Sequence, residues 1–546
     1  MKYLNYSLIL ILFFSCQPSM TFDFALLNAT VYDGLGGEPY LANIGIKDDS
    51  IAYIGEQELN ASQVIDLNGL AVAPGFINML SWANVSLLED GRSMSDLMQG
   101  VTLEVMGEGS SMGPWSESIK AEVLENQTDI TYDIQWTTLG EYLSFLEAKG
   151  VSTNVTSFVG NGTLRRHVIG YEDRKATPEE IQQMKKLLEI EMEQGAVGIS
   201  SSLLYAPSSS ADTEELIALA QVASAYNGMY ISHIRNEGDA LYESVNELIT
   251  IAREAQIASE IYHLKASGQP NWHKMDSVFN MIETARAEGL AITADMYTYP
   301  ASSTGLHVQL PDWVREGGVD ATIERLSRPE LRSRILSEIV FRNPPETIML
   351  VGFKQPGLRI HAGKYLNEYA VEMGKTPAEA MIDLIVEDDS RIQVVYFSMS
   401  EENINKKIQQ PWMAFCSDAG SLASEGVFLK QSTHPRAYGS FIRVLGEFAR
   451  DRGVISLEEG IRRLTSFPAN NLKIERRGQL APGYFADIVV FDPVRVKDKA
   501  TFEQPHQYAE GIIHVWVNGK QVIKDGVHTG AMPGRFVKGP GYREPS

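Results

Sequence analysis

The chain has 546 residues, of which 44% are hydrophobic and 21% charged, a composition typical of a globular protein with room for roughly two or three domains. Its formal net charge is −23, and its isoelectric point is near 4.9. Because acidic residues predominate without long single-sign blocks, the composition argues against a nucleic-acid partner and leaves the substrate class open.

The first sixteen residues have the pattern of an export signal. Lys2 precedes an apolar run at residues 8–14, which Ser15 and Cys16 follow. The run is too short to span a bilayer, so residues 1–16 are excluded from the fold. The segment resembles a bacterial lipoprotein signal, which implies an exported protein facing the periplasm and anchored by lipid on Cys16; a plain secretory signal is the alternative. Because Cys416 is the only other cysteine, a lipidated Cys16 leaves no disulfide.

Short β-prone runs separated by turn residues occupy both ends of the remaining chain. In residues 22–72 these runs fall at 24–27, 30–32, 44–46, 51–54 and 64–66. In residues 476–540 they fall at 486–492 and 513–517, and Asn518-Gly519 then predicts a hairpin with the run at 520–523. We expect the two segments to form one small composite β-sandwich domain.

Residues 73–475 alternate strand-like and helix-like segments. Helical patterns at 178–194 and 277–288 follow the cap-like residues Thr177 and Asp276. Strand-like runs fall at 102–106, 155–160, 196–200, 229–233, 260–263, 291–295, 348–351, 394–398 and 413–417. Repeated βα units predict an α/β fold built on a (β/α)8 barrel of the TIM type. An insertion is expected near residues 306–361, where proline and arginine interrupt the pattern.

Two histidines end strand-like runs that are one repeating unit apart. His233 ends the first run and His263 the second, and residues 240–258 between them carry apolar positions at helical spacing. A right-handed crossover places consecutive parallel strands side by side, so their carboxyl ends lie at the same end of the barrel. The two imidazoles are therefore expected within reach of one metal ion.

Two carboxylates follow other strands at the same end. Asp418 follows the run at 412–417, and Glu108 follows the run at 101–106. Two neutral imidazoles and one carboxylate suit zinc with a fourth position open to water, and a second carboxylate can then move protons. Structural roles are possible for each residue: a strand-end histidine is often only hydrogen-bonded, Ser417-Asp418 is a common helix cap, and Glu104 can face the interior in place of Glu108.

Many short blocks of the chain match one enzyme family in the same order. The blocks are Ala73-Pro74-Gly75-Phe76-Ile77, Gln99-Gly100-Val101-Thr102, Gly195-Ala196-Val197-Gly198-Ile199-Ser200 with Tyr205, Ser232-His233-Ile234-Arg235-Asn236-Glu237-Gly238, His263-Leu264-Lys265-Ala266, Asp295-Met296-Tyr297-Thr298-Tyr299, Ser417-Asp418 with Gly420, His434-Pro435-Arg436 with Tyr438-Gly439, and Ala486-Asp487. Over nearly its full mature length the chain resembles the N-acyl-D-amino-acid deacylases (D-aminoacylases) of the amidohydrolase superfamily. The resemblance implies a barrel with a flanking β-sandwich, in agreement with the pattern of elements.

The chain departs from the family pattern at three places. Where the superfamily carries His-x-His after the first barrel strand, this chain has Leu80 and Trp82, which do not bind zinc, so we expect a single zinc site. The family's bridging cysteine aligns with Gly109, and we expect the adjacent Glu108 to supply a carboxylate oxygen instead, as in some N-acetylglucosamine-6-phosphate deacetylases. The third departure is Asn161, where the family usually has histidine; the sequence suggests no role for it.

The resemblance implies hydrolysis of the amide bond of N-acyl-D-amino acids to a carboxylate and a free D-amino acid. Zinc held by Glu108, His233 and His263 would lower the pKa of water, and Asp418 would take the water's proton and later deliver it to the leaving amine. In the family, cationic and hydroxyl groups hold the α-carboxylate of the substrate. The corresponding residues here are Lys265, Arg436, Tyr297 or Tyr299, and Ser303.

Three other functions stay open at this point. The same chemistry with a larger acyl pocket gives a dipeptidase that cleaves peptides with a D-residue on the carboxyl side. A cyclic-amide hydrolase of the dihydropyrimidinase or dihydroorotase type needs no free α-carboxylate. Loss of His-x-His also fits an inactive, membrane-tethered binding protein. Against an inactive protein, the chain retains the other residues that the resemblance implies for the site, namely His233, His263, Lys265, Asp418 and Arg436.

Overall fold

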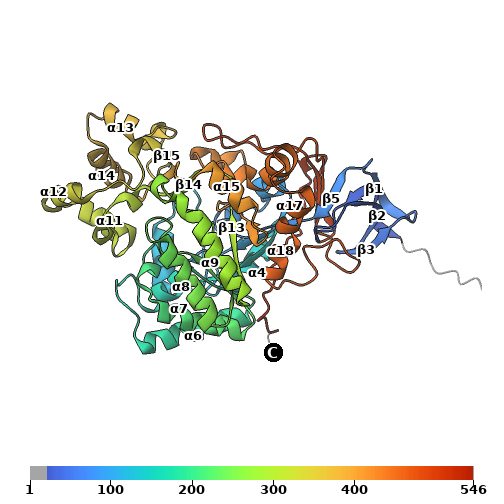
Figure 1. Cartoon of the computed structure of the whole chain (residues 1–546), viewed down its shortest axis with the longest axis horizontal. Helices are drawn as coiled ribbons and strands as arrows, with labels where there is room; N and C mark the ends of the chain where they lie inside the picture. Colours follow the sequence, from blue (N-terminus) through green and yellow to red (C-terminus); the bar gives the residue numbers. More distant parts are fainter. Residues whose placement is uncertain (1–20, 545–546) are drawn as a thin grey trace, which may run out of the picture.

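The computed structural model describes residues 21–544, so the export signal and Cys16 predicted above lie outside the described residues. Figure 1 shows a β-rich region at one end of the molecule, a barrel in the middle and a separate lobe at the other end. Among the described helices, none has both the length and the apolar character needed to cross a bilayer.

A nine-stranded mixed sheet joins the two ends of the described chain. Its strands are β1 (Phe22–Val31), β2 (Tyr40–Lys47), β3 (Ser50–Gly55), β4 (Ala61–Asp66), β5 (Ala71–Pro74), β18 (Ile488–Phe491), β19 (Ile512–Val517), β20 (Lys520–Lys524) and β21 (Val527–His528). Strands β5 and β18 pair antiparallel, with Ala73 opposite Val489, and this pairing links the two segments. The two termini thus share one sheet, whereas its layering as a sandwich stays a prediction.

Eight parallel strand positions form the barrel within the described residues. They are β6 (Phe76–Asn78), β7 (Val101–Met106), β8 (Asn154–Ser157) continued by β9 (Val159–Gly160), β10 (Gly198–Ser202), β11 (Met229–His233), β12 (Ala258–Ile261), β13 (Ile292–Met296) and β17 (Met413–Phe415). The barrel closes where the amide of Met79 donates to the carbonyl of Phe415 at 3.3 Å. Most residues of these strands are buried, as expected where both faces of a parallel sheet are covered. The predicted barrel is therefore confirmed.

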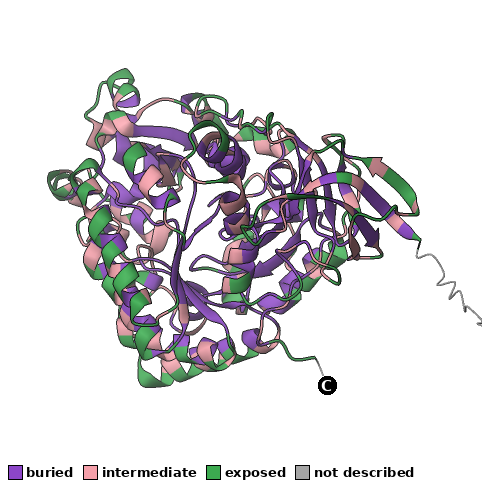
Figure 2. Cartoon of the chain, turned by 45° about the vertical axis from the view of Figure 1, so that its right-hand side comes forward, coloured by how far each residue is buried: buried purple, intermediate pink, exposed green. Residues whose placement is uncertain are grey.

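Helices cover the outside of the barrel and expose one face to solvent (Figure 2). Those after the central strands are α6 (Pro178–Glu193), α7 (Thr213–Ala225), α8 (Leu241–Glu254) and α9 (Met275–Ala287). The others of this region are α1 (Ser86–Glu89), α2 (Met94–Leu97), α3 (Glu117–Glu125), α4 (Leu139–Lys149), α5 (Asn161–Val168), α15 (Glu401–Ile408), α16 (Arg436–Arg443), α17 (Leu457–Leu464) and α18 (Ser466–Asn471). Thr177 caps α6 as predicted, in a reciprocal pair with Glu180. Asp276, predicted as the cap of α9, instead lies inside its first turn.

A separate lobe lies between barrel strands β13 and β17. Its strands are β14 (Ser302–Gly305), β15 (Ile348–Gly352) and β16 (Gln393–Tyr396), and its helices are α10 (Asp312–Arg315), α11 (Gly318–Leu326), α12 (Pro329–Glu338), α13 (Leu366–Glu372) and α14 (Pro377–Asp388). The predicted insertion at 306–361 is thus too short. The runs at 348–351 and 394–398 were wrongly assigned to the barrel, because they pair antiparallel with each other. A short apolar run has the same pattern in either kind of sheet.

Candidate active site

Three buried side chains meet at the carboxyl end of the barrel. Glu108 follows β7, His233 ends β11, and His263 follows β12. One carboxylate oxygen of Glu108 lies 2.9 Å from Nδ1 of His233 and 2.9 Å from Nε2 of His263. One ligand atom from each residue lies within 4.8 Å of the other two. Two imidazoles and a carboxylate at this spacing fit the donor set of a zinc-type divalent ion.

The turn that carries Glu108 explains why a cysteine does not fit at the next position. Gly109 has a positive φ of 62°, and a β-carbon there would lie 2.2 Å from the β-carbon of Ser202 on β10. Any side chain at residue 109 would therefore force the two strand ends apart. The longer side chain of Glu108 reaches the histidines from the neighbouring position without that clash.

Two site residues hold backbone conformations that bulky side chains rarely adopt. His263 has a φ of 33° and Asp418 a φ of 49°, in the left-handed region. The buried carboxylate of Asp295 on β13 accepts a hydrogen bond from the His263 amide at 2.7 Å, and the Leu80 carbonyl accepts one from the Asp418 amide at 2.9 Å. The surrounding barrel thus fixes both strained residues, as is common at functional sites.

Charge pairing dominates the electrostatics of the three donors. Burial raises the pKa of Glu108, but the adjacent His263 and His233 outweigh burial and hold that pKa well below its usual value. Burial and Lys265 lower the pKa of His263, yet Glu108 and Asp418 overcome them and raise it to about 10. Without a metal ion, a proton on His263 therefore neutralises Glu108.

Zinc affinity is expected to rise with pH. Because the pKa of His263 is raised to about 10, its proton stays bound through neutral pH and must be displaced by the metal, so affinity should increase by up to about tenfold per pH unit below that value. Competition with a chromophoric chelator between about pH 6 and pH 9 measures this slope. A flat profile would show that no proton leaves when the metal binds.

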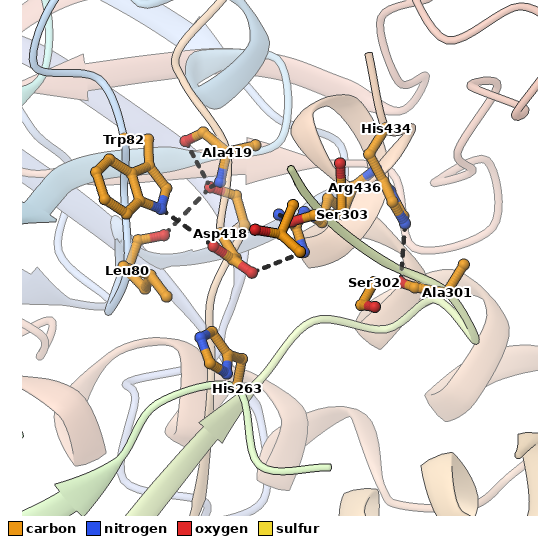
Figure 3. A network of polar contacts seen from close by, with 12 residues as sticks. Leu80, Trp82, His263, Ala301, Ser302, Ser303, Asp418, Ala419, His434 and Arg436 are labelled. Carbon is orange, nitrogen blue, oxygen red and sulfur yellow. Dashed lines mark hydrogen bonds and ion pairs between the residues drawn. The ribbon is translucent and has the colours of Figure 1, made fainter. Parts of the chain in front are cut away.

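Asp418 lies beside these donors and is held from two sides. The indole of Trp82 donates a hydrogen bond to Oδ1 at 3.1 Å, and Nη1 of Arg436 lies 2.6 Å from Oδ2. Figure 3 shows the Asp418 carboxylate between Trp82 and Arg436, with His263 below it. Leu80 and Trp82 occupy the positions of the superfamily's paired histidines. Trp82 instead orients the aspartate.

Lys265 contacts a second carboxylate that sequence reasoning did not assign. Its ammonium donates to Oε1 of Glu237 at 2.5 Å and lies 2.7 Å from Nδ1 of His263. The same Glu237 oxygen lies 3.1 Å from Nδ1 of His263, on the side of the ring opposite Glu108. In the sequence, Glu237 lies four residues after His233, and this spacing could have identified it as a site residue. A carboxylate behind a metal-binding histidine fixes the orientation of its ring.

The remaining predicted substrate-binding residues divide into two groups. Tyr297 lies close to two cations, with the Lys265 ammonium 5.9 Å and the Arg436 guanidinium 4.5 Å from the ring centre. The Tyr297 hydroxyl and Nε of Arg436 are buried and have no hydrogen-bond partner among the described residues. Tyr299 points elsewhere: its hydroxyl contacts Asp498 at 3.2 Å. It is therefore removed from the predicted set.

Asn161, for which the sequence suggested no role, supports one wall of the site. Its amide donates to Glu215 at 3.0 Å and accepts from the Ser208 hydroxyl at 2.8 Å. Glu215 also forms a buried ion pair with Arg165. Asn161 thus belongs to a buried polar cluster that fixes the start of α5, and it offers nothing to the metal.

Two cavities meet at the two histidines and Asp418. The first chamber, of about 530 Å³, has Trp82, Ser208, Arg391 and Arg436 among its lining residues. The second chamber, of about 400 Å³, is bordered by Lys265, Tyr297, Gln309 and Phe341. Both include His233, His263, Ser303 and Asp418. A bond lying at the metal site can therefore have one substituent in each chamber.

Comparisons with known proteins agree with this geometry. Residues 432–523 match the model of the amidohydrolase family. The chain is 34% identical over 526 residues to a D-aminoacylase of Alcaligenes xylosoxydans xylosoxydans, covering 96% of this chain and 99% of that protein.

Two solved structures share the fold at a TM-score of 0.80, each covering 95% of this chain and 100% of the other. One is the N-acyl-D-glutamate deacylase of Bordetella bronchiseptica with zinc and a phosphonate mimic of the tetrahedral intermediate, at 30% identity. The other is a D-aminoacylase with a binuclear metal centre, in which one metal activates and the second attenuates, at 31% identity.

Proposed function

The chain belongs to the N-acyl-D-amino-acid deacylase (D-aminoacylase) family of amidohydrolases, and on this basis we propose that it hydrolyses N-acyl-D-amino acids to a carboxylate and a free D-amino acid. The observation that carries the proposal is the meeting of Glu108, His233 and His263 with Asp418 in one cavity. The relatives' names favour linear N-acyl amides over the cyclic-amide, dipeptidase and binding-protein alternatives.

Each residue of the site has a distinct task in this reaction. Glu108, His233 and His263 would hold one divalent ion, which when bound would polarise the amide carbonyl and lower the pKa of water. Asp418 faces the same cavity as a carboxylate, so it would accept the proton of the attacking water and return it to the leaving amine. The Trp82 and Arg436 contacts keep the Asp418 carboxylate aimed at the reacting group.

The α-carboxylate of the substrate would bind near Tyr297. The Lys265 ammonium and the Arg436 guanidinium lie over that ring from the two chambers, and the Tyr297 hydroxyl and Arg436 Nε are buried donors without a partner among the described residues. A carboxylate satisfies such donors, and a planar guanidinium gives directional hydrogen bonds to it. These contacts would place the amide bond at the metal site.

Turnover of a panel of N-acetyl-D- and N-acetyl-L-amino acids tests the proposal. The protein is assayed as purified, after chelation, and after reconstitution with zinc. Hydrolysis of D-substrates that chelation abolishes and zinc restores is the expected result. Equal rates on L-substrates would contradict the stereochemistry, and no hydrolysis by the reconstituted protein would contradict the function itself.

Activity is expected to reach a plateau at one zinc per chain and to stay there when zinc is in excess. Leu80 and Trp82 replace the histidines that would bind a second ion, and Trp82 lines the cavity with its indole hydrogen-bonded to Asp418. Titration of the chelated protein, followed by activity and by metal analysis, gives both quantities. A second bound equivalent, or inhibition by excess zinc, would contradict the single-site proposal.

A further inference from the structure

The two chambers serve different halves of the substrate if the proposed function holds. Lys265 and Tyr297 border only the second chamber, and Arg436 reaches the same Tyr297 ring from the first. The amino-acid half therefore belongs to the second chamber, with its α-carboxylate beside Tyr297. His233, His263 and Asp418 lie at the junction, and Glu108 lines the first chamber. The first chamber therefore remains for the acyl group, and at about 530 Å³ it has far more room than an acetyl group needs.

All but one of the acidic and arginine side chains that line the first chamber have a charged partner. Its lining carboxylates, Glu108 and Asp418, are both paired within the site. Of its lining arginines, Arg166 pairs with Glu122 at 2.6 Å and Arg436 pairs with Asp418 at 2.6 Å. The third has no such partner.

Arg391 is the arginine without a carboxylate. No described Asp or Glu oxygen lies within 4.0 Å of its guanidinium, whose contact within the protein is a long one of 3.5 Å to the side-chain oxygen of Gln393. Both residues line the first chamber beside polar groups such as Thr163 and Ser208. An unneutralised guanidinium in a polar cavity attracts an anionic group of a ligand.

Arg391 is exposed to solvent, and it lines both the first chamber and a neighbouring cavity of about 650 Å³. The Tyr205 ring stacks edge-on against His233 with 5.3 Å between ring centres, and its hydroxyl contacts Thr304 at 2.7 Å. Next to Thr304, a β-carbon on Gly305 would lie 3.1 Å from the β-carbon of Arg391. Tyr205, Thr304 and Gly305 therefore connect the His233 side of the first chamber to the backbone beside Arg391.

We propose that the first chamber accepts acyl groups that end in a carboxylate and that Arg391 binds this carboxylate. The preferred substrates would then be half-amides of dicarboxylic acids with D-amino acids, such as N-succinyl-D-amino acids. Water adds across the C–N bond to give the dicarboxylate and the free amino acid. A peptide would instead place its α-ammonium beside Arg391, which like-charge repulsion disfavours.

The test compares kcat/KM for N-succinyl-D-leucine, N-acetyl-D-leucine and N-acetyl-D-glutamate. One charge-assisted hydrogen bond at a partly exposed arginine supports a preference of about tenfold for the succinyl over the acetyl compound. Arg391→Gln is expected to bring the ratio near one, and Arg391→Lys to restore part of it. Arg328→Gln is the control, because Arg328 lies in the lobe and pairs with Glu324; it should leave the ratio unchanged.

Failure of this inference is distinguishable from failure of the proposed function. Hydrolysis of N-acetyl-D-leucine without a succinyl preference overturns the inference and leaves the deacylase activity standing. Arg391→Gln could instead lose a preference for N-acetyl-D-glutamate and keep the preference for the succinyl compound. Arg391 would then bind the side chain of the amino acid, and the acyl assignment would be overturned. Succinate, titrated calorimetrically into wild type and Arg391→Gln, gives a second readout: equal affinities would also overturn the inference.

Discussion

Asp418→Asn is expected to lower kcat by about 10²- to 10⁴-fold, the range that general acid–base groups contribute. The amide of asparagine cannot accept the proton of the attacking water, although its oxygen can still accept the hydrogen bond from Trp82. The ion pair with Arg436 is lost, so KM can change as well. Steady-state kinetics on an N-acetyl-D-amino acid measure the effect, and metal analysis should show an unchanged zinc content.

Asp498→Asn provides a matched control for this substitution. Asp498 contacts Tyr299 and Arg443, which resemble the partners of Asp418 in kind, but it borders neither chamber. The control should retain its turnover. If Asp418→Asn kept wild-type kcat with the metal bound, the role of Asp418 in proton transfer would have to be abandoned.

Glu108→Gln is expected to lower zinc affinity by more than about 100-fold, because even the loss of an outer partner of a metal ligand costs 10- to 100-fold. Glutamine has nearly the same shape and can still contact both histidines, but it brings no negative charge to the site. Zinc content after dialysis and competition with a chelator measure the loss. Activity should fall in parallel and return in part at high zinc concentration.

Two comparisons make the Glu108 result specific. His263→Ala should reduce bound metal to a similar degree, because it removes a donor from the same site. Glu243→Gln, at an exposed position on α8, should bind zinc like the wild type. Unchanged zinc affinity in Glu108→Gln would remove the glutamate from the ligand set and leave the two histidines without a third donor.

Much of the site was predictable because it depends on short-range patterns and one topological rule. His233 and His263 end strands that are joined by one helix, and parallel strands connected in this way always bring their carboxyl ends together. Glu108 and Asp418 follow other strands of the same barrel, so the closure that pairs the ends of β6 and β17 brings them to the same place. Strand periodicity therefore indicated the place of His233, His263 and Asp418, and the family resemblance favoured Glu108 over Glu104.

Other features were decided by contacts between distant parts of the chain. The strands of the lobe have the same short apolar pattern as barrel strands, and only their antiparallel pairing shows that they lie outside the barrel. Tyr297 and Tyr299 follow the same strand, yet one borders a chamber and the other contacts Asp498. Nothing local predicts the direction of a side chain after a strand ends, because neighbouring elements determine it.

The sequence by itself determined the barrel and the end at which its polar groups gather, since these follow from residue spacing and the handedness of βαβ units. It also predicted Glu108, His233 and His263 as metal donors, Glu108 through the resemblance to a known family. The tertiary structure decided how the donors are supported. The contacts of Trp82 with Asp418 and of Glu237 with Lys265 join residues far apart in the chain. Such contacts depend on loop conformations, which long-range packing fixes and local patterns do not encode.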